Sequence, residues 1–158
     1  MKLPLFLTLT AAAWLCLATQ AQVLTADQVP AVVKQGFQAK FPVARAVSWK
    51  IKSDKNYEAE FTAKGTEMAV KFDSAGKWLE TESAISHSQL PKAVRSSVGK
   101  RFPGYKIVET QTVQRANVER LIYEVHVENA LEIVKAQLSA EGAVLNQAAK
   151  PKPDKPAR

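Results

Sequence analysis

The sequence predicts an α+β protein that is a tandem duplication, with one helix and four antiparallel strands in each copy. The segment Asp-Gln-Val-Pro that starts at Asp27 recurs as Ser-Gln-Leu-Pro from Ser88, at an offset of 61 (88 − 27). The pair Tyr-Glu at Tyr57 recurs at Tyr123, at an offset of 66 (123 − 57). The second copy therefore has five extra residues (66 − 61) between its first two strands. Because each copy alone would bury little, we expect both to share one antiparallel sheet of about eight strands, with two helices on one face.

Each copy opens with a helix. Asp27 and Ser88 are expected N-cap residues, and Pro30 and Pro91 are expected in the first turn, where a missing N–H costs little. The proline that follows each helix ends it. Apolar residues recur at helical spacing in both copies, at Val29, Val32, Val33, Phe37 and Phe41 and at Leu90, Val94, Val98 and Phe102.

The rest of each copy alternates apolar and polar residues, as expected for strands with one buried face. The first copy should have strands near 47–52, 57–62 and 67–72 and a short one at 77–81, and the second near 106–112, 120–128, 131–138 and 143–146. The residues expected to face the helices include Val47, Trp49, Tyr57, Phe61, Phe72, Tyr123, Val125 and Val127. Asp73 and Gly76 form a predicted β-turn with glycine at a positive φ, and Gly142 repeats it. A calcium loop would need more oxygen ligands.

The first 21 residues are expected to be a cleavable signal peptide. A basic start and a short apolar run are followed by Thr19 and Ala21, small residues that place the cut between Ala21 and Gln22. The run is short for a membrane span, and Leu15 before Cys16 does not fit lipid attachment. We expect a periplasmic or secreted protein with no membrane span and no cysteine in its mature form.

Three sequence blocks resemble the PepSY-like family of secreted bacterial proteins, whose fold is like that of β-lactamase inhibitory protein. The blocks are FDSAGKWLE at 72–80, LPKAV at 90–94 and RFPGYKI at 101–107. The resemblance extends from about Asp27 to Leu145. It implies a periplasmic or cell-surface protein with two α/β repeats. By analogy of shape, it also implies that the open sheet face binds another protein, as an inhibitor of a peptidase or another hydrolase. The expected divisions are a signal peptide (1–21), a first repeat (22–86), a second repeat (87–147) and a basic tail (148–158).

No motif for catalysis or metal binding is recognisable. His87 and His126 are the only histidines, and neither has zinc spacing. Residues 86–88 read Ser-His-Ser, but no nucleophile elbow accompanies them. Glu58 and Glu60 are interpreted as cross-strand partners of lysines rather than as an acid/base pair. We therefore expect no enzyme activity, no metal and no cofactor.

The candidate binding surface is the sheet face away from the helices. In the second copy Ile122, His126 and Ile133 alternate onto this face among charged residues. Trp78 and Tyr105 are expected near an edge, as anchors for a partner. The alternatives are that the apolar residues are ordinary surface residues or form a contact between the two copies, and that the two aromatics complete the core.

The net charge of +7 first suggests an anionic partner. About half of it lies in the tail, 148–158, where prolines alternate with charges and which we expect to be extended, mobile and disordered. The leading interpretation is an exported, non-enzymatic binding protein that contacts a protein of the cell envelope, as an inhibitor of a peptidase or other envelope hydrolase. The alternative is a binder of a small ligand or of an anionic envelope polymer, attracted weakly by the tail. Export argues against nucleic acid as a partner.

Overall fold

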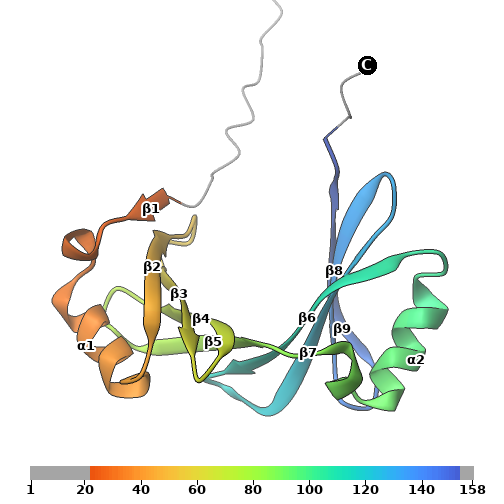
Figure 1. The fold of residues 1–158 in the computed structure, drawn as a ribbon, viewed down its shortest axis with the longest axis horizontal. Helices are drawn as coiled ribbons and strands as arrows, with labels where there is room; N and C mark the ends of the chain where they lie inside the picture. Colours follow the sequence, from red (N-terminus) through yellow and green to blue (C-terminus); the bar gives the residue numbers. More distant parts are fainter. Residues whose placement is uncertain (1–21, 154–158) are drawn as a thin grey trace, which may run out of the picture.

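The computed structural model describes residues 22–153, which form one nine-stranded antiparallel sheet with two α-helices (Figure 1). Strand order in the sheet follows chain order from β1 to β9. The elements of the first half are β1 (Gln22–Leu24), α1 (Ala31–Lys40), β2 (Arg45–Ile51), β3 (Tyr57–Ala63), β4 (Thr66–Phe72) and β5 (Trp78–Ala84). Those of the second half are α2 (Lys92–Arg101), β6 (Lys106–Arg115), β7 (Val118–Glu128), β8 (Glu132–Leu138) and β9 (Val144–Pro151). The predicted α+β class, duplication and single continuous sheet are confirmed.

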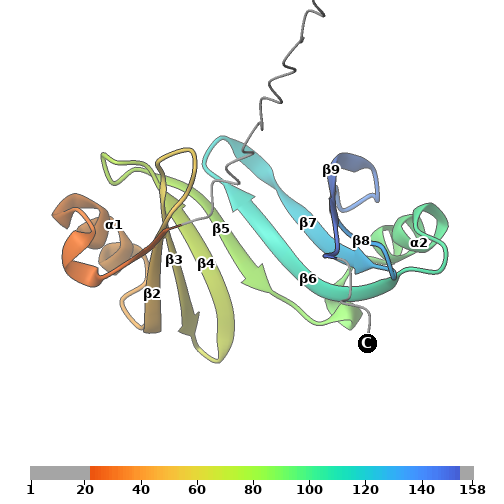
Figure 2. The same ribbon diagram turned by 90° about the horizontal axis from the view of Figure 1, so that it is seen from above.

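The sheet is strongly curved, and both helices lie on its outer side. Figure 1 shows α1 outside one arm of the curved sheet and α2 outside the other, with β5, β6 and β7 between the arms. The view from above separates the two halves along the β5–β6 junction (Figure 2). We call the helix-bearing side the outer face and the opposite side the concave face.

The outer face carries two hydrophobic cores, one in each copy. In the first, Phe37 of α1 meets Phe61 of β3 edge-on, with ring centroids 5.1 Å apart. In the second, Val94 and Val98 of α2 cover Leu138 of β8, and all three are buried. Nearly all the residues predicted to face the helices belong to or pack against these cores, namely Trp49, Tyr57, Phe61, Phe72, Tyr123, Val125 and Val127. Val47 is the exception: it lies at a β-bulge and is 38% exposed.

The predicted N-cap residues Asp27 and Ser88 are wrong, because each lies inside a short 3₁₀ helix that precedes the α-helix. These 3₁₀ helices span Ala26–Gln28 and His87–Gln89. In both copies the backbone N–H of the residue before the 3₁₀ helix donates to the side chain of its final glutamine at 2.8 Å. A proline then occupies the N-cap position of each α-helix, where it needs no N–H partner.

The two copies are joined by a strand pairing that is longer than predicted. β5 was expected to end at Thr81, but it continues to Ala84 because Glu80–Ala84 pair with Gln111–Arg115 of β6. The five extra residues of the second copy lengthen the β6–β7 hairpin, whose strands have 10 and 11 residues against 7 and 7 in β2 and β3. At its tip the Ala116 N–H donates to the Leu79 carbonyl at 2.9 Å. The longer β6–β7 hairpin therefore forms the part of the second copy that pairs with β5 of the first copy.

The prediction of a disordered tail from 148 is wrong for its first residues. Ala148 pairs with Lys135 and Pro151 with Glu132, so β9 runs to Pro151. The small alanines fit a strand beside β8, and proline at the strand end lacks only an N–H that faces away from β8. The predicted signal peptide with Cys16, and residues 154–158, lie outside the described residues.

Candidate functional site

The five residues of the predicted binding surface do not lie together. Ile122, His126 and Ile133 point to the concave face from β7 and β8, since they alternate with the core residues of those strands. Trp78 and Tyr105 instead pack against the first and the second core on the outer face. The structure thus groups three of the five residues and separates the two aromatics from them.

The two aromatics are held by contacts of their own. The Trp78 indole N–H donates to Thr81 Oγ1 at 2.8 Å, and the Lys40 ammonium lies 4.0 Å from a Trp78 ring centroid. The Tyr105 hydroxyl donates to Glu132 at 2.5 Å, and this hydrogen bond raises the pKa of Tyr105. Both side chains thus complete the fold, the alternative considered from the sequence.

The apolar residues on the concave face are mostly buried and do not form an exposed patch. Ile122 is only 4% exposed, and Val113, its cross-strand neighbour on β6, is fully buried. Ile133, at 36%, is the one apolar residue of the predicted trio with substantial exposure. Polar side chains therefore dominate what this face presents to a partner.

The centre of the concave face is a buried glutamate, Glu124, which has no exposed surface. Its Oε1 accepts hydrogen bonds from Gln111 Nε2 at 2.6 Å and from Lys135 Nζ at 2.7 Å, and lies 3.0 Å from His126 Nε2. Its Oε2 accepts from Gln137 Nε2 at 2.7 Å. Four side chains from three strands thus converge on one carboxylate.

Sheet register explains this convergence. Gln111 of β6 and Gln137 of β8 are the direct cross-strand partners of Glu124, so their side chains rise on the same face beside it. His126 lies two residues further along β7, again on this face, and pairs with Lys135 of β8. The sequence marked this face as polar, but register across three strands could not be read from it.

The hydrogen bonds fix the charge of Glu124. Burial alone would raise the pKa of Glu124, but the bonds from His126, Lys135 and Gln137 outweigh it and lower the pKa to about 2. The same contact with Glu124 outweighs burial at Lys135 and raises the pKa of its ammonium. The buried carboxylate and its ammonium partner are therefore both ionised at neutral pH.

His126 lies between two carboxylates. Its Nε2 faces Glu124, and its Nδ1 lies 2.7 Å from Oε2 of Glu109 on β6. The hydrogen bond to Glu124 raises the pKa of His126 against the opposing effect of burial, and the charge of Glu109 raises it further. Both ring nitrogens are thus engaged by acceptors, which favours the imidazolium and leaves no free nitrogen to act as a base.

The network continues across the junction into the first copy. Arg115 of β6 donates from Nε to Glu80 of β5 at 2.5 Å and from Nη2 to Gln137 at 3.1 Å. Lys71 of β4 lies 3.5 Å from the same Glu80 carboxylate. Burial raises the pKa of Glu80, but its bonds to Arg115 and Lys71 reverse the shift and lower it. Hydrogen-bonded polar side chains therefore run without a break from β4 to β8.

An acidic hollow of about 420 Å³ opens beside this network. Its lining includes four carboxylates and no lysine, arginine or histidine, the acids being Glu60, Glu67, Glu82 and Glu109. Burial, together with the neighbouring Glu124, Glu80 and Glu58, raises the pKa of Glu82, which accepts one hydrogen bond from Gln111 Nε2 at 3.1 Å. Glu60 is paired with Lys50 and Glu109 with His126, so Glu67 and Glu82 are the carboxylates of the hollow that would meet a cationic group.

The described residues hold no metal cluster and no unpaired buried polar side chain. Between residues 22 and 153 no group of three histidine, cysteine or acidic side chains is placed to hold a metal ion. Within the same range every buried side-chain nitrogen and oxygen has a hydrogen-bond partner, so the side chains of the network are held in fixed positions. No helix in this range is long and apolar enough to cross a membrane.

Two copies of one α+β unit that share a single antiparallel sheet define the fold class of this protein. The family model described as "Putative beta-lactamase-inhibitor-like, PepSY-like" matches residues 9–70 and 55–145. The chain belongs to this PepSY-like family, as the three sequence blocks indicated. A comparison with curated proteins gives no match.

Solved structures of similar fold come from Bacteroides. A "putative periplasmic" protein from Bacteroides eggerthii is 19% identical, with a TM-score of 0.69 over 77% of this chain and 88% of its own. A DUF2874 family protein from Bacteroides uniformis is 21% identical, with a TM-score of 0.68 over 76% and 88%. A BLIP-like protein from Bacteroides fragilis is 23% identical, with a TM-score of 0.64 over 80% and 90%. At these identities the likeness establishes the fold alone.

Proposed function

We propose that this protein is an exported, non-enzymatic binding protein whose concave face contacts a protein of the cell envelope, as an inhibitor of a peptidase or other envelope hydrolase. The observation that carries the proposal is the hydrogen-bonded network around Glu124 on a face that no described element covers. Long charged side chains normally lose rotational freedom on binding, at a cost to affinity. Here Lys135 is already held by Glu124 and Arg115 by Glu80, so most of this rotational freedom is lost before another protein binds.

The distribution of charge favours a partner with a basic projection. The hollow lined by Glu60, Glu67, Glu82 and Glu109 would receive an arginine or lysine side chain. The hollow is lined by residues of β2 to β6 on the concave side of the sheet. The sheet is curved (Figure 1), so its concave side would fit a convex surface. The name of the Bacteroides fragilis relative, a BLIP-like protein, is consistent with a role in binding proteins.

Affinity capture with defined variants tests the proposal. The tagged protein is used to isolate partners from an envelope extract, and each partner is then purified for calorimetric titration and for assay of its own hydrolytic activity. Glu67→Lys and Ile133→Lys change exposed residues on opposite arms of the concave face, and we expect each to weaken binding at least tenfold. Gln38→Lys, an exposed position on α1, is the matched control and should bind normally. Unchanged affinity in both concave-face variants would remove this face from the proposal, and unchanged hydrolase activity would remove inhibition.

A second candidate, binding of a small ligand, has one specific observation in its favour. A hollow of about 610 Å³ lies on the outer face between the end of α1 and the link from β5 to α2. Its lining is largely apolar, including Phe41, Val43 and Ile85, with Lys40 and Lys64 as its basic residues. Such a site would suit an apolar chain that ends in a carboxylate. Titration with a fluorescent fatty acid separates the candidates, because Val43→Glu should abolish that binding and leave capture of a protein partner intact.

A further inference from the structure

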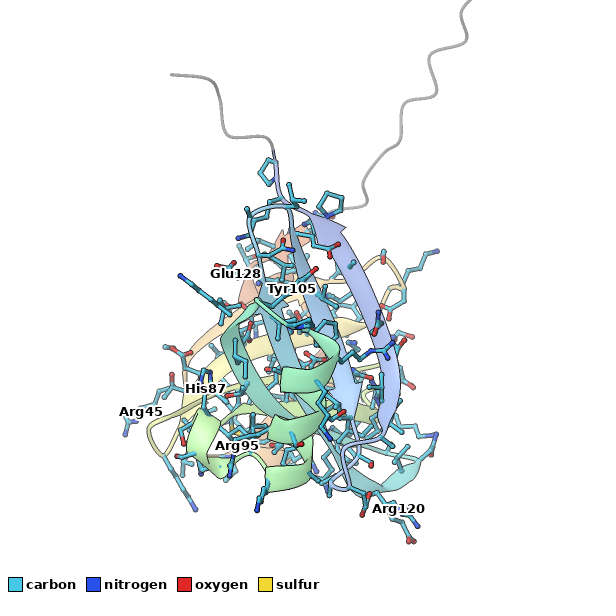
Figure 3. The ribbon with its side chains drawn as sticks, turned by 90° about the vertical axis from the view of Figure 1, so that its right-hand side faces the viewer. Arg45, His87, Arg95, Tyr105, Arg120 and Glu128 are labelled. Atoms are coloured by element: carbon cyan, nitrogen blue, oxygen red, sulfur yellow. The ribbon has the colours of Figure 1, made fainter. Side chains whose placement is uncertain are left out.

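The second copy ends in a strand with an open edge. β9 is the last strand of the sheet, and within residues 22–153 no strand pairs with its outer side. Figure 3 shows β9 as the outermost ribbon, beside α2. All of its residues after Val144 are exposed. Open edges are the usual sites at which a further strand joins a sheet.

The hydrogen bonds at the start of β8 show which backbone groups of β9 are free. Lys152 N–H donates to the Leu131 carbonyl at 2.8 Å, and Asn129 N–H donates to the Glu132 carbonyl at 3.1 Å. Leu131 therefore faces β9 and Glu132 faces β7, and this alternation continues along the strand. It follows from the register that Ala148 and Lys150 bond to β8, whereas Gln147 and Ala149 turn their N–H and C=O groups outward.

The centre of this edge lacks the usual protection against strand pairing. Natural edges are guarded by lysine, proline, bulges or short length. β9 has a bulge near its start and Lys150 and Pro151 at its end, but residues 144–149 carry no charge. At the opposite edge of the sheet β1 is only three residues long. The sheet is therefore open to pairing at one edge, over a neutral stretch.

We infer that β9 pairs with β9 of a second copy, antiparallel, about a two-fold axis at Ala148. In this register Gln147 of each copy lies opposite Ala149 of the other, so every outward N–H of these residues finds a carbonyl. Ala148 faces its own counterpart in a non-hydrogen-bonded pair, where Cα atoms approach to about 4.5 Å and small side chains fit. Lys150 lies opposite Asn146, so no like charges meet.

Neighbouring side chains leave this edge accessible. The Gln147 side chain is held by Arg101 of α2, whose Nε donates to its Oε1 at 2.8 Å, so it is directed to the outer face and not across the edge. Pairing in the plane of the sheet also leaves both concave faces open. The pair would present two binding faces, and it does not depend on the function proposed for either.

Sedimentation velocity on the full chain, exported and purified, tests the pairing over about 1–500 µM, a range suited to a small interface. We expect a concentration-dependent dimer. Ala149→Pro removes an outward N–H without removing a bond to β8, and Ala148→Lys places like charges on the axis. Each should weaken dimerisation at least tenfold, while Ala149→Ser, which keeps the N–H, should not. Circular dichroism confirms that each variant is folded. A monomer at all concentrations, or an Ala149→Pro variant that dimerises normally, would overturn the inference.

Cross-linking tests the register itself. Cys16 lies in the predicted signal peptide and no cysteine follows it, so in the exported protein we expect Ala148→Cys to provide the single thiol. This thiol lies on the proposed axis, at a separation that suits a disulfide. Mild oxidation should yield a covalent dimer with peptide mass spectrometry placing the bond at position 148. Gln38→Cys, exposed on α1, is the control. Equal rates of cross-linking for the two variants would contradict the proposed axis.

Discussion

Replacing Glu124 with glutamine tests whether the concave network is built on a charge. Glutamine has nearly the same shape, but one of its two terminal atoms donates hydrogen bonds. If its oxygen keeps the donors Gln111 and Lys135, its amide nitrogen must face the Gln137 amide, also a donor in the present geometry. Rotating the Gln137 amide would relieve that conflict, but it would break the bond that Gln137 accepts from Arg115. No arrangement of Glu124→Gln satisfies every neighbour.

The size of the effect follows from the pKa. The Glu124 pKa is lowered from 4.5 to about 2, which corresponds to about 3 kcal/mol of preference for the ionised form in the folded state. Truncating one partner of a buried ion pair costs about 3–5 kcal/mol. We therefore expect Glu124→Gln to lower the free energy of unfolding at pH 7 by about 3 kcal/mol.

The dependence on pH has a definite sign. A carboxylate whose pKa is depressed on folding stabilises the folded state above its unfolded pKa, 4.5, and loses that contribution as the pH falls toward 2. Denaturant unfolding followed by fluorescence at several pH values measures this for the wild type and the variant. Their difference should be complete above about pH 5 and small near pH 2.

Glu67→Gln is the matched control, because Glu67 is exposed on the same face and has no described ion pair. It should change the free energy of unfolding by less than about 0.5 kcal/mol. A Glu124→Gln variant as stable as the control at pH 7, or a difference between wild type and variant that does not shrink in acid, would refute the account of Glu124 as the ionised centre of the network.

Three further predictions concern features outside that carboxylate. NMR titration should give His126 a pKa above 6.5, and Glu109→Gln should lower this pKa because it removes a neighbouring negative charge. The contribution of His126 to stability should be present at low pH and disappear as the pH rises through the pKa of His126 in the folded state. A pKa at or below 6.5 would contradict this prediction. Gly76→Ala and Gly142→Ala should each lower the melting temperature more than Gly65→Ala. All three glycines have positive φ, but of the three only Gly76 and Gly142 would bring a Cβ against a helix carbonyl, at 2.7 and 2.6 Å. Equal decreases in melting temperature for the three variants would disprove the close approach. Ending the chain after Gln147 should lower the melting temperature by several degrees, whereas ending it after Pro153 should not, because residues 148–151 pair with β8. Equal melting temperatures would show that residues 148–151 do not stabilise the fold.

Much of the fold could be predicted from the sequence because the duplication repeats its local signals. The turn glycines Gly76 and Gly142 were predicted from position alone, and the structure adds that each turn abuts the helix of its own copy, at Val32 and Ala93. Alternation likewise placed nearly every core residue on the correct side of the sheet. These features depend on neighbours close in sequence, which a single chain reveals directly.

The features that depend on distant strands could not be predicted. β5 continues past Thr81 only because β6 pairs with it, and β9 includes Ala148 only because β8 offers an edge. Alternation placed Glu124 on the open face, where glutamate is usually solvated, whereas its burial depends on the register that sets Gln111 and Gln137 beside it. The sequence did contain an indication that this site differs between the copies, since Gln111 and Gln137 occupy the positions of Lys50 and Lys71 in the first copy.

That substitution explains why the two halves of the concave face differ. Glu58, the counterpart of Glu124, lies in register between Lys50 and Lys71, and Lys52 lies 3.3 Å from its carboxylate. At the corresponding positions Glu124 has neutral amides, which satisfy hydrogen bonds but not charge, so the balancing cations come from Lys135 and His126. These cations are held in place by a carboxylate that is itself inaccessible. If a protein partner binds through these two cations, Glu124→Gln should weaken its affinity at least tenfold in calorimetry, while Glu58→Gln should leave the affinity unchanged. Equal losses of affinity in the two variants would show that the partner contacts the whole concave face rather than the second copy alone.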